Sequence, residues 1–78
     1  MKVEFYANHS IHALVFADGR EVGRTIRVTD GREYFMPTDP RLAALEGRRL
    51  WGQYTDQDLA GDIGLALEKG IAAMQSLH

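Results

Sequence analysis

The chain has 78 residues, no cysteine and a formal net charge of −2 at pH 7. This length predicts one domain, residues 1–78, with a small core, because such a domain buries only about 60% of its unfolded surface. Without cysteine the chain has neither a disulfide nor a thiolate ligand for zinc, and the slightly acidic balance favours neither nucleic acid nor a membrane as a partner. No apolar run approaches the roughly 18 residues of a membrane span, and no apolar leader follows Lys2, so we expect a cytoplasmic protein.

The first half of the chain predicts an antiparallel sheet. Residues 2–7 alternate between apolar and polar, and residues 11–17 are almost wholly apolar, as expected of strands. Asp18-Gly19 and Asp30-Gly31 are Asp-Gly pairs between such runs, which is the strongest short-range signal for a two-residue hairpin turn. Gly23 indicates a β-bulge between them. The two hairpins predict a meander of four strands.

Two-residue turns also predict a register. They would pair Val15 with Val22 and Ile11 with Ile26 in the first hairpin, and would bring Phe35 beside Ile26 in the second. These five apolar side chains would then share one face of the sheet. That face needs a cover.

The second half of the chain predicts the cover. Thr55 is a good N-cap, and Asp58 follows at the capping-box position. Apolar residues then recur at helical spacing, which predicts a helix from Asp56 to about Ser76. The apolar stripe consists of Leu59, Ile63, Ala66, Leu67, Gly70, Met74 and Leu77.

A shorter helix is predicted between the sheet and the long helix. Pro40 suits the first helical position, residues 41–46 make about two turns, and Gly47 ends them. Residues 48–54 are extended and could add a short strand. The predicted fold class is therefore α+β: a mainly antiparallel four-stranded sheet, formed by a β-meander with two Asp-Gly hairpins, one short helix, and a long C-terminal helix packed across one face.

The sequence lacks the residue sets that catalysis requires. His9 and His12 are spaced H-x-x-H, but they straddle a turn and the start of a strand, so we expect no metal site. Ser10 lies between them without a third residue to orient a base. No glycine-rich phosphate loop is present. We expect a protein that is not an enzyme and that uses no cofactor or metal.

Three carboxylates, Asp56, Asp58 and Asp62, lie at the start of the predicted helix. One interpretation is structural, because Asp56 and Asp58 suit the positive end of the helix dipole and the cap. The other is a partner-binding surface that engages a basic, nucleic-acid-binding groove on another protein. Asp62 lies beyond the first turn, so Asp62→Arg is expected to leave folding intact while it weakens binding.

The opposite side of the helix carries Gly61, Leu65 and Ala72. Scattered apolar residues on a surface are normal. Alternatively, these residues form a second interface, either of a homodimer or with a partner. An exposed sheet edge is the other candidate for a homodimer contact.

Positive charge and aromatic rings coincide at Arg48, Arg49, Trp51 and Tyr54. This combination suits stacking on single-stranded nucleic acid. It also suits a small domain in which Trp51 covers the edge of the sheet and the arginines are solvated. Because the overall balance is acidic, we expect no direct contact with nucleic acid.

Part of the chain resembles a small bacterial domain family of unknown function associated with toxin–antitoxin loci. The resemblance rests on a D-G-R strand start, a P-R-L segment, and a tryptophan followed by an acidic run. The residues are Asp30-Gly31-Arg32, Pro37, Pro40-Arg41-Leu42, Trp51 and Asp56-Gln57-Asp58-Leu59. It implies an antitoxin-like module that binds a toxin, and it implies no catalytic residue.

The chain as a whole is similar in kind to phage-encoded anti-CRISPR inhibitors, which are compact, slightly acidic and built from a small sheet with one or two helices. This similarity implies a protein in the cytoplasm of a host cell that binds a CRISPR surveillance complex of the Cascade type and blocks its binding of target DNA. It is our leading expectation. An antitoxin-like module and a small nucleic-acid-binding domain are the alternatives.

Overall fold

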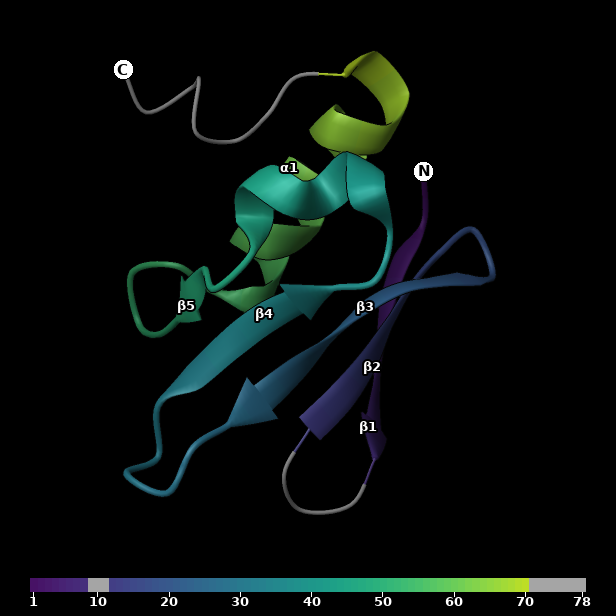
Figure 1. Cartoon of the computed structure of the whole chain (residues 1–78). Coiled ribbons are helices and arrows are strands. Elements are labelled where there is room, and N and C mark those ends of the chain that lie inside the picture. The colour runs from purple at the N-terminus through teal and green to yellow at the C-terminus, as the bar shows by residue number, and fades with distance from the viewer. Residues whose placement is uncertain (9–11, 71–78) are drawn as a thin grey trace.

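A computed structural model describes residues 1–8 and 12–70. Five antiparallel strands form one sheet in sequence order, with the 3₁₀ helix η2 and the α-helix α1 after β4 and β5 (Figure 1). Their bounds are β1 Val3–Asn8, β2 His12–Ala17, β3 Arg20–Arg27, β4 Glu33–Pro37, η2 Pro40–Leu45, β5 Arg49–Leu50 and α1 Asp56–Lys69. The predicted α+β class and meander are confirmed. The predicted number of four strands is one too few, because the extended segment after η2 pairs with β4 as the two-residue strand β5.

The first hairpin has the predicted two-residue turn. Asp18 and Gly19 both have positive φ angles, 50° and 82°, as a type I′ turn requires. Ala17 and Arg20 are the last pair before this turn.

The second hairpin has a longer loop than predicted. The Gly31 amide donates to the Val28 carbonyl at 2.9 Å, and the Val28 amide donates to the Arg32 carbonyl at 2.8 Å. This is a three-residue loop that ends in a glycine with φ of 92°, the second common hairpin connection. The prediction of a two-residue turn at Asp30-Gly31 was therefore wrong.

A β-bulge in β3 changes the register of the first hairpin. Phe16 pairs with Glu21, whereas Val15 pairs with Gly23. Val22 is thus the extra residue, and the predicted pair Val15–Val22 is wrong although the bulge itself was anticipated. Val22 is still buried, because its side chain adds to the core face.

The bulge and the three-residue loop together separate Ile26 from the core face of the sheet. Ile26 pairs with His12 and Tyr34 instead of with Ile11 and Phe35, and Thr25 takes the place beside Phe35. A one-residue shift exchanges the two faces of a strand. Ile26 therefore lies on the face of the sheet away from Val15 and Phe35, contrary to prediction. Ile11 lies outside the described residues.

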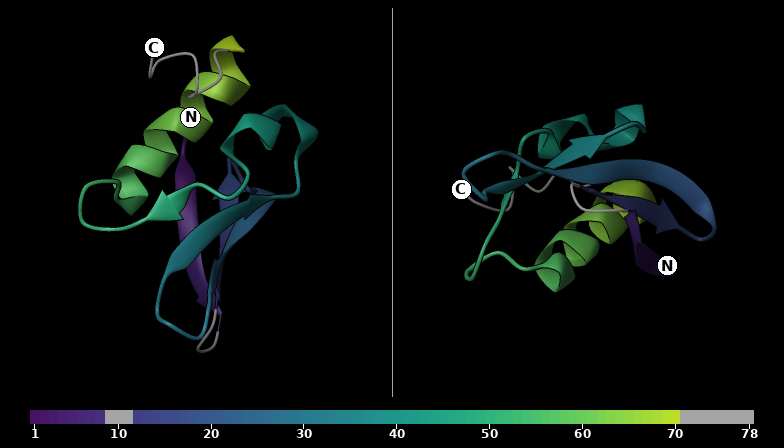
Figure 2. Two further views of the ribbon diagram at one scale, coloured as in Figure 1. Left: turned by 60° about the vertical axis from the view of Figure 1, so that its left-hand side comes forward. Right: turned by 90° about the horizontal axis from the view of Figure 1, so that it is seen from below.

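One face of the sheet and α1 enclose the core. Seen from below in Figure 2, α1 lies along one side of the sheet. The buried apolar residues are Val15, Ala17, Val22, Phe35, Leu42, Leu45, Leu50, Leu59, Ile63 and Ala66. The predicted helix stripe is thus confirmed at its first three positions, and Leu67 packs partly against the same core.

The long helix is shorter than predicted. It ends at Lys69, and Gly70 follows as a left-handed cap with φ of 68° whose amide donates to the Ala66 carbonyl at 3.1 Å. Gly70 is therefore an exposed cap and not part of the apolar stripe. The predicted end at Ser76 was wrong, and Met74 and Leu77 lie outside the described residues.

The predicted short helix is a 3₁₀ helix. Asp39 caps it by accepting a hydrogen bond from the Arg41 amide at 2.9 Å, and Pro40 occupies the first position. The helix is distorted at Leu42, where φ is −101° and ψ is 15°. Its two turns bury Leu42 and Leu45 against β4 and α1, which closes the core at the end of the sheet.

Candidate functional site

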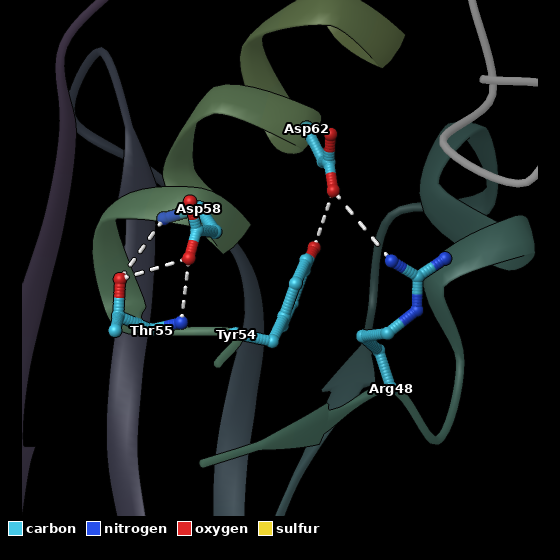
Figure 3. Close-up of polar contacts among 5 residues, drawn as sticks. All are labelled: Arg48, Tyr54, Thr55, Asp58 and Asp62. Atoms are coloured by element: carbon cyan, nitrogen blue, oxygen red, sulfur yellow. Dashed lines mark hydrogen bonds and ion pairs between the residues drawn. The ribbon is translucent and has the colours of Figure 1, made fainter. Parts of the chain in front are cut away.

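Asp58 is part of the N-terminal cap of α1. The Thr55 amide donates to Asp58 Oδ2 at 2.8 Å, and the Asp58 amide donates to Thr55 Oγ1 at 3.4 Å (Figure 3). This is the predicted capping box. The capping interpretation of Asp58 is therefore confirmed.

Asp62 is engaged by two side chains from the segment before α1. The Tyr54 hydroxyl donates to Asp62 Oδ2 at 2.5 Å, and Arg48 Nη1 lies 3.6 Å from the same oxygen (Figure 3). The Arg48 guanidinium also lies 5.0 Å from the centre of the Tyr54 ring. Burial raises the pKa of Tyr54, and the hydrogen bond to Asp62 raises it further, so this hydroxyl stays protonated. Asp62 thus joins α1 to the preceding segment.

Asp56 differs from the other two carboxylates because it takes part in neither the capping box nor the Tyr54 contact. It is the first residue of α1 and is exposed. Neighbouring groups still displace part of the water around its carboxyl, which raises the pKa of Asp56, and the nearby Glu33 of β4 raises this pKa as well. Two carboxylates therefore lie close enough to repel each other. Arg27 also approaches Glu33, with Nη2 3.6 Å from Glu33 Oε1.

These two carboxylates line a hollow beside the start of α1. Its volume is about 500 Å³. Its walls are Glu33, Leu50, Trp51, Thr55, Asp56 and Gln57. The hollow therefore combines negative charge with an aromatic ring, which together suit a cationic side chain. The sequence identified Asp56 but missed Glu33, because only the β4–β5 register, with Glu33 opposite Leu50, brings it there.

The predicted nucleic-acid cluster is divided between two sites. Arg48 and Tyr54 contact Asp62, as described above. Arg49 and Trp51 instead contact each other, with the Arg49 guanidinium 5.5 Å from the Trp51 ring, and Trp51 is 49% exposed. Side chains alternate along an extended segment, so neighbouring arginines point to opposite sides. The four residues do not form one surface.

The described part of the predicted dimer face on α1 is small. Gly61 is exposed with open space around it, and Leu65 is half-buried. Ala72 lies outside the described residues. His9 and Ser10 also lie outside them, and residues 1–8 and 12–70 contain no group of three potential metal ligands.

The uncovered face of the sheet is a feature that sequence reasoning missed. It carries Tyr6, Leu14, Phe16, Ile26, Tyr34 and Met36, whose register places them away from α1. The available signal was the run Tyr34-Phe35-Met36, in which three large side chains follow one another. Because side chains alternate between the two faces of a strand, burial of Phe35 places Tyr34 and Met36 on the face away from the core.

In the part of the chain that the structure describes, no helix is long and apolar enough to span a membrane. Comparisons with protein families, with curated proteins and with solved structures gave no match to this chain.

Proposed function

We propose that this protein is a non-enzymatic inhibitor that binds another protein by receiving a lysine or arginine side chain in the hollow beside α1. The observation that carries the proposal is the pair of neighbouring carboxylates, Asp56 and Glu33, next to Trp51. A cation between the two carboxylates would remove their mutual repulsion, and its alkyl stem would pack on the indole ring. The hollow is open, so a side chain on the surface of a partner can reach it.

The partner's contact surface is expected to be basic. Proteins that bind nucleic acid line the binding path with lysine and arginine to neutralise phosphates. A small protein that inserts carboxylates into such a path would exclude the nucleic acid, because complementary charge guides and orients association. A CRISPR surveillance complex is the first candidate partner on this reasoning, and a toxin with a basic active surface is the second.

Binding to a purified surveillance complex tests the proposal. Asp56→Asn and Glu33→Gln each remove one carboxylate from the hollow, so each should raise the Kd by roughly tenfold, about 1.4 kcal/mol. Glu46→Gln is the matched control, because it removes an exposed carboxylate outside this hollow. The wild type should also prevent the complex from binding target DNA.

Three results would count against the proposal in different ways. If the wild type binds and all three variants bind equally well, the hollow is not the contact. If the wild type binds a toxin and not the surveillance complex, the antitoxin alternative is correct. If a lysine-rich peptide leaves the fluorescence of Trp51, the single tryptophan of the chain, unchanged at millimolar concentration, the hollow does not receive cations.

A further inference from the structure

We propose that Arg27 competes with an incoming cation for the carboxylate of Glu33 and thereby sets the affinity of the hollow beside α1. This competition takes place at the site of the proposed function, on which it rests. Arg27 does not line the hollow. It lies at the end of β3 and reaches Glu33 from the neighbouring strand. Arg27 is thus an internal counter-ion that a partner has to replace.

The sheet places the side chain of Glu33 between Arg27 and the hollow. Glu33 pairs with Arg27 of β3 on one side and with Leu50 of β5 on the other, and paired residues of neighbouring strands project to the same face. Glu33 and Leu50 both line the hollow, together with Asp56 of α1. A cation can therefore approach the Glu33 carboxylate from either side, and Arg27 already approaches it from one.

The contact between Arg27 and Glu33 is close enough to attract and loose enough to break. Arg27 Nη2 lies 3.6 Å from Glu33 Oε1, which is longer than the roughly 2.8 Å of a charge-assisted hydrogen bond. The arginine side chain is 58% exposed and the glutamate side chain 28%. Exposed ion pairs of this kind contribute little to stability, so a better-placed cation can take the position of Arg27.

Arg27 and a bound cation oppose each other because they share one carboxylate. Without a ligand, the guanidinium of Arg27 partly neutralises Glu33, which lies near Asp56. A lysine or arginine in the hollow neutralises both carboxylates, and it then faces the positive charge of Arg27 across Glu33. Part of the attraction for the ligand is therefore used to displace Arg27, which makes binding weaker than it would be to the two carboxylates alone.

Arg49 is the other arginine beside the hollow, but it contacts a different group. Its guanidinium lies 5.5 Å from the centre of the Trp51 ring. Arg49 pairs with Tyr34, one position along from the pair of Leu50 and Glu33, and adjacent residues of a strand project to opposite faces. Arg49 therefore does not compete for Glu33, and the competition is specific to Arg27.

Arg24 provides a matched control on the same strand. Its Nη2 lies 3.6 Å from Glu21 Oε2 and its side chain is 46% exposed, so this contact resembles that of Arg27 in distance and exposure. Neither Arg24 nor Glu21 lines the hollow beside α1. Arg24→Gln and Arg27→Gln each remove one positive charge from a chain of net charge −2. Any difference between the two variants therefore reports the position of the arginine.

Titration with a pentalysine peptide with blocked ends tests the competition without a partner protein. Binding is followed by the fluorescence of Trp51 at low ionic strength. Arg27→Gln should lower the Kd of the peptide by about three- to fivefold, which corresponds to an exposed ion pair. Arg24→Gln should change the Kd by less than about twofold, because its charge is remote from the hollow. Circular dichroism confirms that the variants are folded, and Arg27→Thr replaces Arg27→Gln if the latter is not, because threonine is favoured in strands.

A double-mutant cycle with Glu33→Gln separates competition from simple repulsion. If Arg27 acts by holding Glu33, the gain in affinity from Arg27→Gln should disappear when residue 33 is already glutamine. A gain of the same size with and without Glu33→Gln would mean that Arg27 acts only as a nearby positive charge, and it would overturn the inference.

The results separate failure of this inference from failure of the proposed function. Tighter binding by Arg27→Gln, absent from Arg24→Gln and lost with Glu33→Gln, supports the inference. Unchanged or weaker binding by Arg27→Gln overturns it, and so does equal tightening by both arginine variants; in each case weaker binding by Asp56→Asn still upholds the hollow as the cation site. If the peptide changes the fluorescence of neither the wild type nor Arg27→Gln at millimolar concentration, the hollow receives no cation and both proposals are wrong.

Discussion

The backbone of Gly23 in β3 lies directly against the ring of Phe35 in β4. A Cβ atom at Gly23 would be 2.6 Å from two carbons of that ring and 2.9 Å from the Met36 carbonyl oxygen. Phe35 is completely buried and cannot move aside without opening the core. Gly23→Ala should therefore destabilise the protein by about 1–3 kcal/mol through overpacking, measured by urea unfolding.

Gly61→Ala is the matched control for this prediction. Gly61 lies in the middle of α1, where an added Cβ atom would meet no neighbouring atom within 4 Å, and alanine is the better helix former by about 1 kcal/mol. The variant should be slightly more stable than the wild type. Equal destabilisation by both substitutions would show that Phe35 is not the cause at Gly23.

Asp62→Arg should unfold or strongly destabilise the protein. The substitution removes the acceptor of the Tyr54 hydroxyl and places a second guanidinium beside Arg48. Loss of a partly buried hydrogen bond to a charged group costs about 1.5–3 kcal/mol. This outcome reverses the expectation from sequence that Asp62 can be changed freely.

A double-mutant cycle measures the contact itself. Tyr54→Phe removes the donor of the hydrogen bond, Asp62→Ala removes its acceptor, and the double variant removes both. Because the two residues are in direct contact, their effects on the free energy of unfolding should not add. Additive effects would mean that the short contact contributes nothing to stability.

Asp56 should titrate above the ordinary value of 3.8 for an aspartate. Burial is the larger cause and Glu33 the smaller, so Glu33→Gln should lower the pKa of Asp56 only in part. Carbon-13 NMR of the Asp56 carboxyl measures both values. A bound cation should lower the pKa of Asp56. Binding of a cation in the hollow should therefore weaken as the pH falls through the pKa of this carboxyl.

Asp39 should stabilise the fold in a pH-dependent way. Hydrogen bonds from Arg41 hold the pKa of Asp39 below its ordinary value of 3.8, so the folded state binds fewer protons than the unfolded state. Asp39 makes its full contribution to the free energy of unfolding above pH 3.8, and this contribution is lost as the pH falls through the pKa of Asp39 in the folded state. Asn is also a good N-cap, so the Asp39→Asn variant loses the charge but keeps the cap. It should be less stable than the wild type by up to about 1 kcal/mol above pH 3.8, and this difference should disappear below the folded-state pKa of Asp39. A constant difference down to pH 2 would contradict this.

Features that depend on a few neighbouring residues could be predicted from the sequence. The turn at Asp18-Gly19 needs two positive φ angles, and the Thr55–Asp58 capping box needs only two side chains three residues apart. The helical stripe from Leu59 to Ala66 likewise follows from spacing along the chain.

Features that depend on the register between distant residues could not be predicted. Gly23 suggested a bulge, but nothing local shows that Val22 is the extra residue or that the loop at Asp30-Gly31 has three residues. These two one-residue shifts separate Ile26 from Val15 and from Phe35. In the same way Asp56 was recognised from its position at the start of the helix. Glu33 was not, because it meets Asp56 only after β4 and β5 have paired.

The bulge in β3 also bears on how the chain tolerates changes in length. Val22 is the residue without a partner in β2, so its deletion would leave Phe16 with Glu21 and Val15 with Gly23 as before. Loss of Thr25 would instead turn the remainder of the strand over and exchange the faces of Ile26 and Arg27. Single-residue gaps among descendants of this sequence are therefore expected at the bulge sooner than in the rest of β3, because loss of the buried Val22 removes one core side chain and the hydrogen bonds to its carbonyl but leaves the two faces of the strand in place.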